Sequence, residues 1–161
     1  MKLGEGDDSA TGQPAAHPSH RRQAGEQELW LGFGGRADQF WLRLLRPGFR
    51  HCFAGLRDAG GWTVLDPLSG RLLVVRLDVP AGFDLPAFWR RAGCAVLGPF
   101  VPAAPAARRP WLSPFSCVTL CRALLGPGSP RAMTPYGLFR ALEEKNTIMR
   151  KMFLTDGVLS R

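Results

Sequence analysis

The sequence predicts one α+β domain, in which a small antiparallel sheet packs against helices. The chain has 161 residues, of which 45% are hydrophobic and 10% aromatic, so it is large enough to bury a core without disulfide or metal cross-links. Short apolar runs separated by turn residues predict meandering strands in the first half of the chain. Helical periodicity with capping residues follows in the second half. Together these observations predict an α+β fold.

Three strands are expected in the first half. The runs 49–56 and 62–65 flank Asp58-Ala59-Gly60-Gly61, whose residues are typical of a β-hairpin turn. A second turn, 66–70, leads to a third strand over 72–77. Residues 94–97 are a further candidate for a short strand.

The clearest helix is expected to run through residues 118–125. Ser113 or Ser116 can cap it, and Gly126-Pro127 end it by the usual C-terminal chemistry. The other helices are predicted from apolar spacing and from proline in the first turn. They span residues 37–45, 87–91 and 136–146.

Residues 1–28 and 147–161 are expected to lie outside the domain, which spans 29–146. The first segment is rich in Gly, Ser, Gln and Pro and holds a single Leu, which is typical of a disordered tail. In the second segment, Ile148, Met149 and Met152 alternate with basic residues. It is either the last helix continued or a strip that binds a partner protein.

Charge and apolar runs exclude several classes of protein. The net charge is +8, but the basic residues are spread along the chain, so specific binding to nucleic acid is not expected. No apolar run is long enough for a membrane-spanning helix. The N-terminal residues are acidic where a signal peptide would be apolar, so no export signal is expected and the four cysteines should be reduced thiols.

Cys117 and His51 form the strongest candidate for a chemical site. Cys117 falls in the first turn of a capped helix, where free N–H groups and the helix dipole stabilise a thiolate. His51 is the only histidine of the predicted domain and lies at the start of its first strand. A cysteine at a helix start that faces a histidine on a sheet is the arrangement of papain-like cysteine hydrolases. The order of His before Cys is that of their circularly permuted branch.

Asp66 is the candidate for orienting the histidine. If the turn pairs Asp58 with Gly61, Phe53 lies opposite Asp66, on the same face as His51. A shift of one residue would place Asp66 on the other face.

Each of these residues also has a structural explanation. Cysteine is among the most buried residue types, a buried histidine is often only hydrogen-bonded, and Asp before Pro commonly opens a turn. A zinc site is a further alternative, since Cys117 and Cys121 share a helix face and could bind zinc with His51 and Cys94. No paired C-x-x-C spacing supports zinc. Cys52 should point to the opposite face from His51 and belong to the core.

Four segments carry a resemblance to a known group of proteins: RPGFRHC (46–52), WTVLDP (62–67), FSCVTLCRALLG (115–126) and MTPYGL (133–138). They resemble small proteins encoded by phages and prophages of alphaproteobacteria. Those proteins in turn resemble the permuted papain-like group, which includes lecithin retinol acyltransferase-like and cell-wall endopeptidase-like enzymes. The likeness covers about residues 40–142 and implies a permuted papain-like fold. It departs from the acyltransferase pattern at Ser116, where that pattern has Asn.

These observations predict a phage-encoded cysteine hydrolase or transferase that acts on an amide or ester, with a cell-wall peptide as one candidate substrate. Cys117 would be the nucleophile, with its backbone N–H in the oxyanion hole, His51 the general base and then acid, and Asp66 the orienting group. Trp111 and Ser116 would line the substrate groove. No cofactor or metal is expected.

The alternative is a non-catalytic phage structural or assembly protein that keeps the fold. In that case residues 147–161 would bind other phage proteins. In either case the expected location is the cytoplasm or a phage particle.

Overall fold

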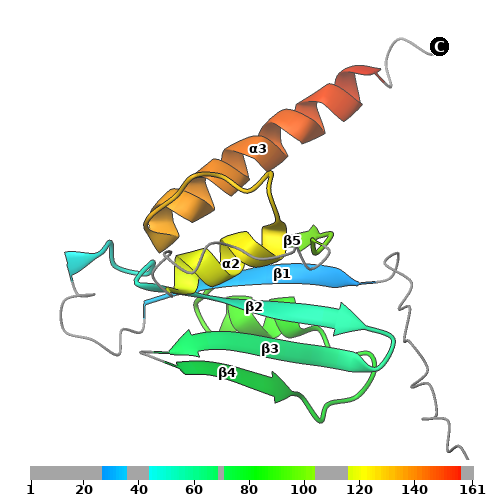
Figure 1. Ribbon diagram of the computed structural model, residues 1–161. Helices are drawn as coiled ribbons and strands as arrows, with labels where there is room; N and C mark the ends of the chain where they lie inside the picture. Colours follow the sequence, from blue (N-terminus) through cyan, green and yellow to red (C-terminus); the bar gives the residue numbers. More distant parts are fainter. Residues whose placement is uncertain (1–26, 36–43, 69–70, 104–115, 157–161) are drawn as a thin grey trace, which may run out of the picture.

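A computed structural model describes residues 27–35, 44–68, 71–103 and 116–156. These residues form a five-stranded antiparallel sheet in the order β4-β3-β2-β1-β5, together with three helices (Figure 1). The α+β class expected from the sequence is therefore confirmed. The elements are β1 (Glu28–Gly34), β2 (His51–Asp58), β3 (Gly61–Leu68), β4 (Arg71–Arg76), α1 (Leu85–Arg91), β5 (Ala95–Phe100), α2 (Cys117–Leu125) and α3 (Pro135–Asp156).

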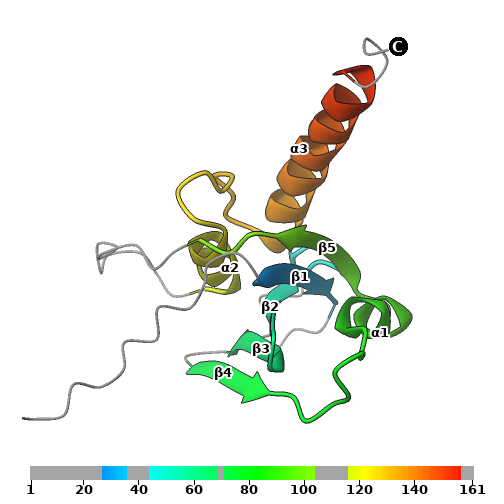
Figure 2. The ribbon, with the colours of Figure 1, turned by 90° about the vertical axis from the view of Figure 1, so that its right-hand side faces the viewer.

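The sheet separates two apolar clusters. On one face, Leu29, Leu31 and Phe33 of β1 are fully buried against α2 and α3. On the other face, Trp62 of β3 packs with Trp89 of α1. Figure 2 shows α1 and α2 on opposite sides of the sheet. The two faces follow from the period of two along each strand, which sends alternate side chains to opposite sides.

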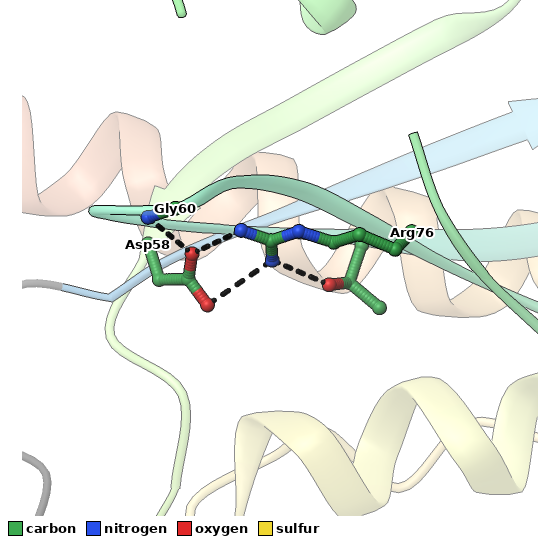
Figure 3. A network of polar contacts seen from close by, with 4 residues as sticks. Asp58, Gly60 and Arg76 are labelled. Carbon is green, nitrogen blue, oxygen red and sulfur yellow. Dashed lines mark hydrogen bonds and ion pairs between the residues drawn. The ribbon is translucent and has the colours of Figure 1, made fainter. Parts of the chain in front are cut away.

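The hairpin of β2 and β3 has the predicted register. Asp58 pairs with Gly61 and Ala54 with Leu65, which leaves Ala59 and Gly60 as a two-residue turn. Asp58 accepts a hydrogen bond from the Gly60 N–H at 2.9 Å, and Arg76 of β4 donates to both carboxylate oxygens of Asp58, at 2.7 and 3.2 Å (Figure 3). The turn is thereby tied to the end of β4.

The central strand β1 was not among the strands expected from the sequence. Leu29, Leu31 and Phe33 lie on one face, as a period of two requires, but Gly32 and Gly34 weaken the local signal. Tertiary packing explains the glycine at position 32, since a Cβ there would collide with the ring of Phe53. Strand β1 pairs with β2 over its whole length and with β5 on its other edge.

The second turn begins later than predicted. Asp66 and Pro67 were expected in a turn over 66–70, but both belong to β3, which pairs with β4 from Thr63–Arg76 to Leu68–Arg71. Proline is tolerated there because the ladder between β2 and β3 ends at Ala54–Leu65, so no β2 acceptor needs a donor from Pro67.

The domain boundaries also differ from those expected. Glu28, placed in the N-terminal tail, is the first residue of β1; residues 1–26 of that segment lie outside the described residues. Most of the helix expected over 37–45 also lies outside them, and the described Leu44 and Leu45 are not in an α-helix.

The last helix crosses the expected boundary at residue 146. Helix α3 continues to Asp156, because no Gly or Pro interrupts it after Gly137. Its C-terminal part projects away from the sheet (Figures 1 and 2). Of the two alternatives for residues 147–161, the structure thus shows a continued helix up to Asp156. Within the described ranges, no helix is both long and apolar enough to span a membrane.

Candidate active site

The N-terminus of α2 positions Cys117. Ser116 is the N-cap residue: its hydroxyl accepts a hydrogen bond from the Thr119 N–H at 3.2 Å, and the Thr119 hydroxyl accepts one from the Ser116 N–H at 2.8 Å. This reciprocal pair is a capping box, which fixes the first turn of the helix. Cys117 is the first residue of α2, where helix geometry leaves its own N–H without an intrahelical acceptor.

His51 and Asp66 meet across the hairpin. His51 Nε2 lies 2.6 Å from Asp66 Oδ1. Continuing the register beyond Ala54–Leu65 would place His51 and Asp66 on one face as diagonal neighbours, a separation that polar side chains can bridge. The ring of His51 also stacks against Phe53, with ring centroids 6.0 Å apart. The predicted contact between Asp66 and His51 is therefore present.

Cys117 lies within hydrogen-bonding contact of the same imidazole. Because Nε2 of His51 binds Asp66, the remaining ring nitrogen, Nδ1, is the one left for the thiol. The structure thus brings together the three residues that the sequence analysis singled out, on three different elements: β2, β3 and α2.

The surroundings of His51 favour its charged form. Burial lowers the pKa of His51, but hydrogen bonds with Asp66 and Cys117, together with the negative charges of both groups, outweigh burial and raise the pKa from 6.5 to about 10. The side chain is only 16% exposed, so water screens these charges weakly.

The pKa of Cys117 is shifted in the opposite direction, downward. A hydrogen bond from the Cys52 side chain is the largest influence. Burial opposes it, and a hydrogen bond with His51 and the backbone N–H of Cys52 add to it, so that the pKa of Cys117 falls from 9.0 to about 4. Between these two pKa values the site holds a thiolate and an imidazolium, the activated form of a cysteine nucleophile.

Cys52 has a role that the sequence analysis missed. Its place in the core was predicted, and its side chain is fully buried. The contact with Cys117 was not predicted, because it joins β2 to α2 and has no local signal. Hydrogen bonds with Cys117 and Cys121, together with burial, raise the pKa of Cys52, so this thiol stays protonated and able to donate.

The remaining candidates have different outcomes. Ser116 is the N-cap described above, next to the thiol. Trp111 lies outside the described residues. Of the proposed zinc ligands, Cys94 packs with the α1 cluster, on the other side of the sheet from Cys121. Within the described part of the chain, no group of three or more His, Cys, Asp or Glu side chains is arranged to hold a metal ion.

Comparisons of this chain with protein-family models, with curated proteins and with solved structures found no match.

Proposed function

We propose that this protein is a cysteine hydrolase or transferase that acts on an amide or ester bond through an acyl-enzyme. The observation that carries the proposal is the arrangement in which Asp66 binds Nε2 of His51 at 2.6 Å and Cys117 hydrogen-bonds with the same imidazole. Thiol-based acyl transfer requires a nucleophile in contact with a base, and a carboxylate that orients the base.

In the first half of the reaction, the Cys117 thiolate attacks the carbonyl carbon of the substrate. The negative charge moves to the carbonyl oxygen, where the free N–H of Cys117 at the start of α2 stabilises it. The C–N or C–O bond then breaks. The leaving group takes the proton of the His51 imidazolium, and a thioester on Cys117 remains.

In the second half, neutral His51 removes a proton from water, which attacks the thioester carbon. The carbon–sulfur bond breaks, the acid leaves, and the thiolate and the imidazolium are restored. An acceptor alcohol or amine in place of water would give a transferase by the same steps. Asp66 keeps the ring oriented throughout and stabilises its positive charge.

The permuted papain-like fold belongs to the same proposal. Its support is the order of the site along the chain, with His51 on β2, Asp66 on β3 and Cys117 at the start of α2, and the antiparallel sheet against which α2 packs. Phage origin and a cell-wall peptide as substrate remain proposals that rest on the resemblance of the segments around these residues.

The test is the accumulation of an acyl-enzyme from an activated ester. We expect p-nitrophenyl acetate to release a burst of about one nitrophenol per protein chain. Intact mass spectrometry should find one acetyl group per chain, and fragmentation of the tryptic peptide that carries Cys117 and Cys121 should assign it to Cys117. The burst should be lost in Cys117→Ala and strongly slowed in His51→Ala, while Cys94→Ala serves as the matched thiol control. If all thiols are acetylated slowly and equally, the non-catalytic phage assembly protein becomes the better interpretation.

A further inference from the structure

Three cysteines, Cys52, Cys117 and Cys121, belong to one packed cluster where α2 lies on β2. Cys52 makes hydrogen bonds with both Cys117 and Cys121, whereas the groups that shift Cys117 are Cys52 and His51 and do not include Cys121. Cys52 and Cys121 are fully buried, so neither can contact a substrate. The function of Cys52 must therefore act through Cys117.

The sheet also directs the backbone of Cys52 toward Cys117. In the two-residue hairpin, Asp58 and Gly61 form the closing pair, so alternate residues of β2, including Cys52, point their N–H toward the β3 side. The ladder has already ended at Ala54–Leu65. Continued by two residues, it would place Cys52 opposite Pro67.

Proline disrupts the pairing at this point, because it has no N–H to donate to the carbonyl of Cys52. The β2–β3 ladder ends before this pair, and the N–H of Cys52 donates to the sulfur of Cys117.

We propose that Cys52 is a positioning residue that holds the Cys117 sulfur with two hydrogen bonds, one from its thiol and one from its backbone N–H. This inference rests on the proposed function and adds a second activating partner beside His51. Two donors on the sulfur stabilise the thiolate, which is both the attacking group and the group that leaves when the thioester is hydrolysed. They also keep the sulfur aligned between the imidazole and the first turn of α2.

The experiment is the pH dependence of iodoacetamide alkylation at Cys117, followed by mass spectrometry in the full-length protein. In Cys52→Ala, which removes the thiol donor, we expect the midpoint of the profile to move upward by roughly one to two pH units. Cys52→Ser supplies a hydroxyl donor and should restore most of the shift. Cys121→Ala is the matched control: it also removes a fully buried thiol beside Cys52 but should leave the midpoint unchanged.

The outcomes separate this inference from the proposed function. If the wild-type thiol titrates like a free cysteine, near pH 8.5, the proposed function fails. If the wild-type midpoint is low and Cys52→Ala leaves it unchanged, only the role of Cys52 is overturned. An equal shift in Cys121→Ala would assign the effect to packing instead.

A second measurement does not need Cys52 to be replaced. The amide proton of Cys52, observed by NMR in the wild type, should shift as Cys117 titrates, and the shift should disappear in Cys117→Ala. An amide resonance that does not respond to this titration would contradict the backbone hydrogen bond.

Discussion

The imidazole of His51 connects the two other site residues. It binds Asp66 through Nε2 at 2.6 Å and contacts Cys117 as well. Asp66 fixes the orientation of the ring and favours its protonated form, and the protonated ring in turn favours the thiolate. A substitution of Asp66 is therefore expected to affect Cys117 through His51, and a substitution of Cys117 to affect Asp66.

Selective alkylation tests the state of Cys117. At pH 6, below the titration range of ordinary thiols, iodoacetamide should label Cys117 while Cys94, which is also partly exposed, remains unmodified. In His51→Ala the labelling of Cys117 at this pH should decrease at least several-fold, because the imidazolium no longer stabilises the thiolate. Equal labelling of Cys94 and Cys117 in the wild type would contradict the activated state.

The same ion pair predicts a plateau in stability against pH. The pKa of His51 is raised to about 10 from 6.5, and that of Cys117 is lowered to about 4 from 9.0. From pH 4 to 6.5 the unfolded chain holds one more proton, on Cys117, so stability should rise with pH. From 6.5 to 9 both states hold the same number of protons. From 9 to 10 only the folded state keeps the His51 proton, so stability should fall.

Urea denaturation from pH 4 to 10 measures this contribution, as the difference between the wild type and the double variant His51→Ala/Cys117→Ala. The expected difference curve rises, is flat between about pH 6.5 and 9, and then falls. A difference that rises steadily through pH 9 would mean that His51 is neutral in the folded protein.

At the scale of elements, the site depends on where α2 begins and on how β1 and β2 pack. The sequence was sufficient for the first up to the choice of cap: the helical pattern and Gly126 define α2, Ser113 or Ser116 could begin it, and the cap is Ser116. It was not sufficient for the second, because β1 is stabilised by its neighbours and not by local propensity.

Loss of the N-cap should weaken α2. Ser116→Ala removes the acceptor for the Thr119 N–H and is expected to lower the free energy of unfolding by about 1 kcal/mol. Ser116→Asn keeps a side-chain acceptor and should lower it less. Chemical denaturation of both variants provides the measurement, and an equal loss in both would show that the cap bond is not the cause.

A substitution of Gly32 tests how β1 packs against Phe53, the residue whose ring stacks on His51. A Cβ at this position would meet the ring of Phe53, which is held between His51 and Trp89. Gly32→Ala should therefore cost roughly 1 to 3 kcal/mol of stability through overpacking. The matched control is Gly82→Ala, since a Cβ at Gly82 meets nothing within 4 Å. Equal melting temperatures for the two variants would contradict this packing argument.

At the scale of the molecule, the central position of β1 determines how much of the N-terminus can be removed. Residues 1–26 contain a single Leu, so their deletion should leave the melting temperature unchanged. Deletion of residues 1–31 removes half of a strand that pairs on both edges, and this variant should show no cooperative thermal transition. A melting temperature several degrees lower for the shorter deletion would contradict the first expectation.

Local chemistry in the sequence determined much of this protein. Turn residues predicted the Asp58–Gly61 pairing and hence that Asp66 and His51 share a face, and capping residues predicted that Cys117 lies in the first turn of α2. Turn and capping patterns involve only a few consecutive residues, so they can be recognised without knowledge of the tertiary structure.

Only the tertiary structure decided the rest. Strand β1 lies at the centre of the sheet because long-range pairing and burial outweigh its glycines, and β3 continues through Asp66 because β4 pairs with it. The contact between Cys52 and Cys117 depends on the packing of α2 against β2. Contacts between segments distant in sequence depend on how the elements pack, so no local pattern could predict them.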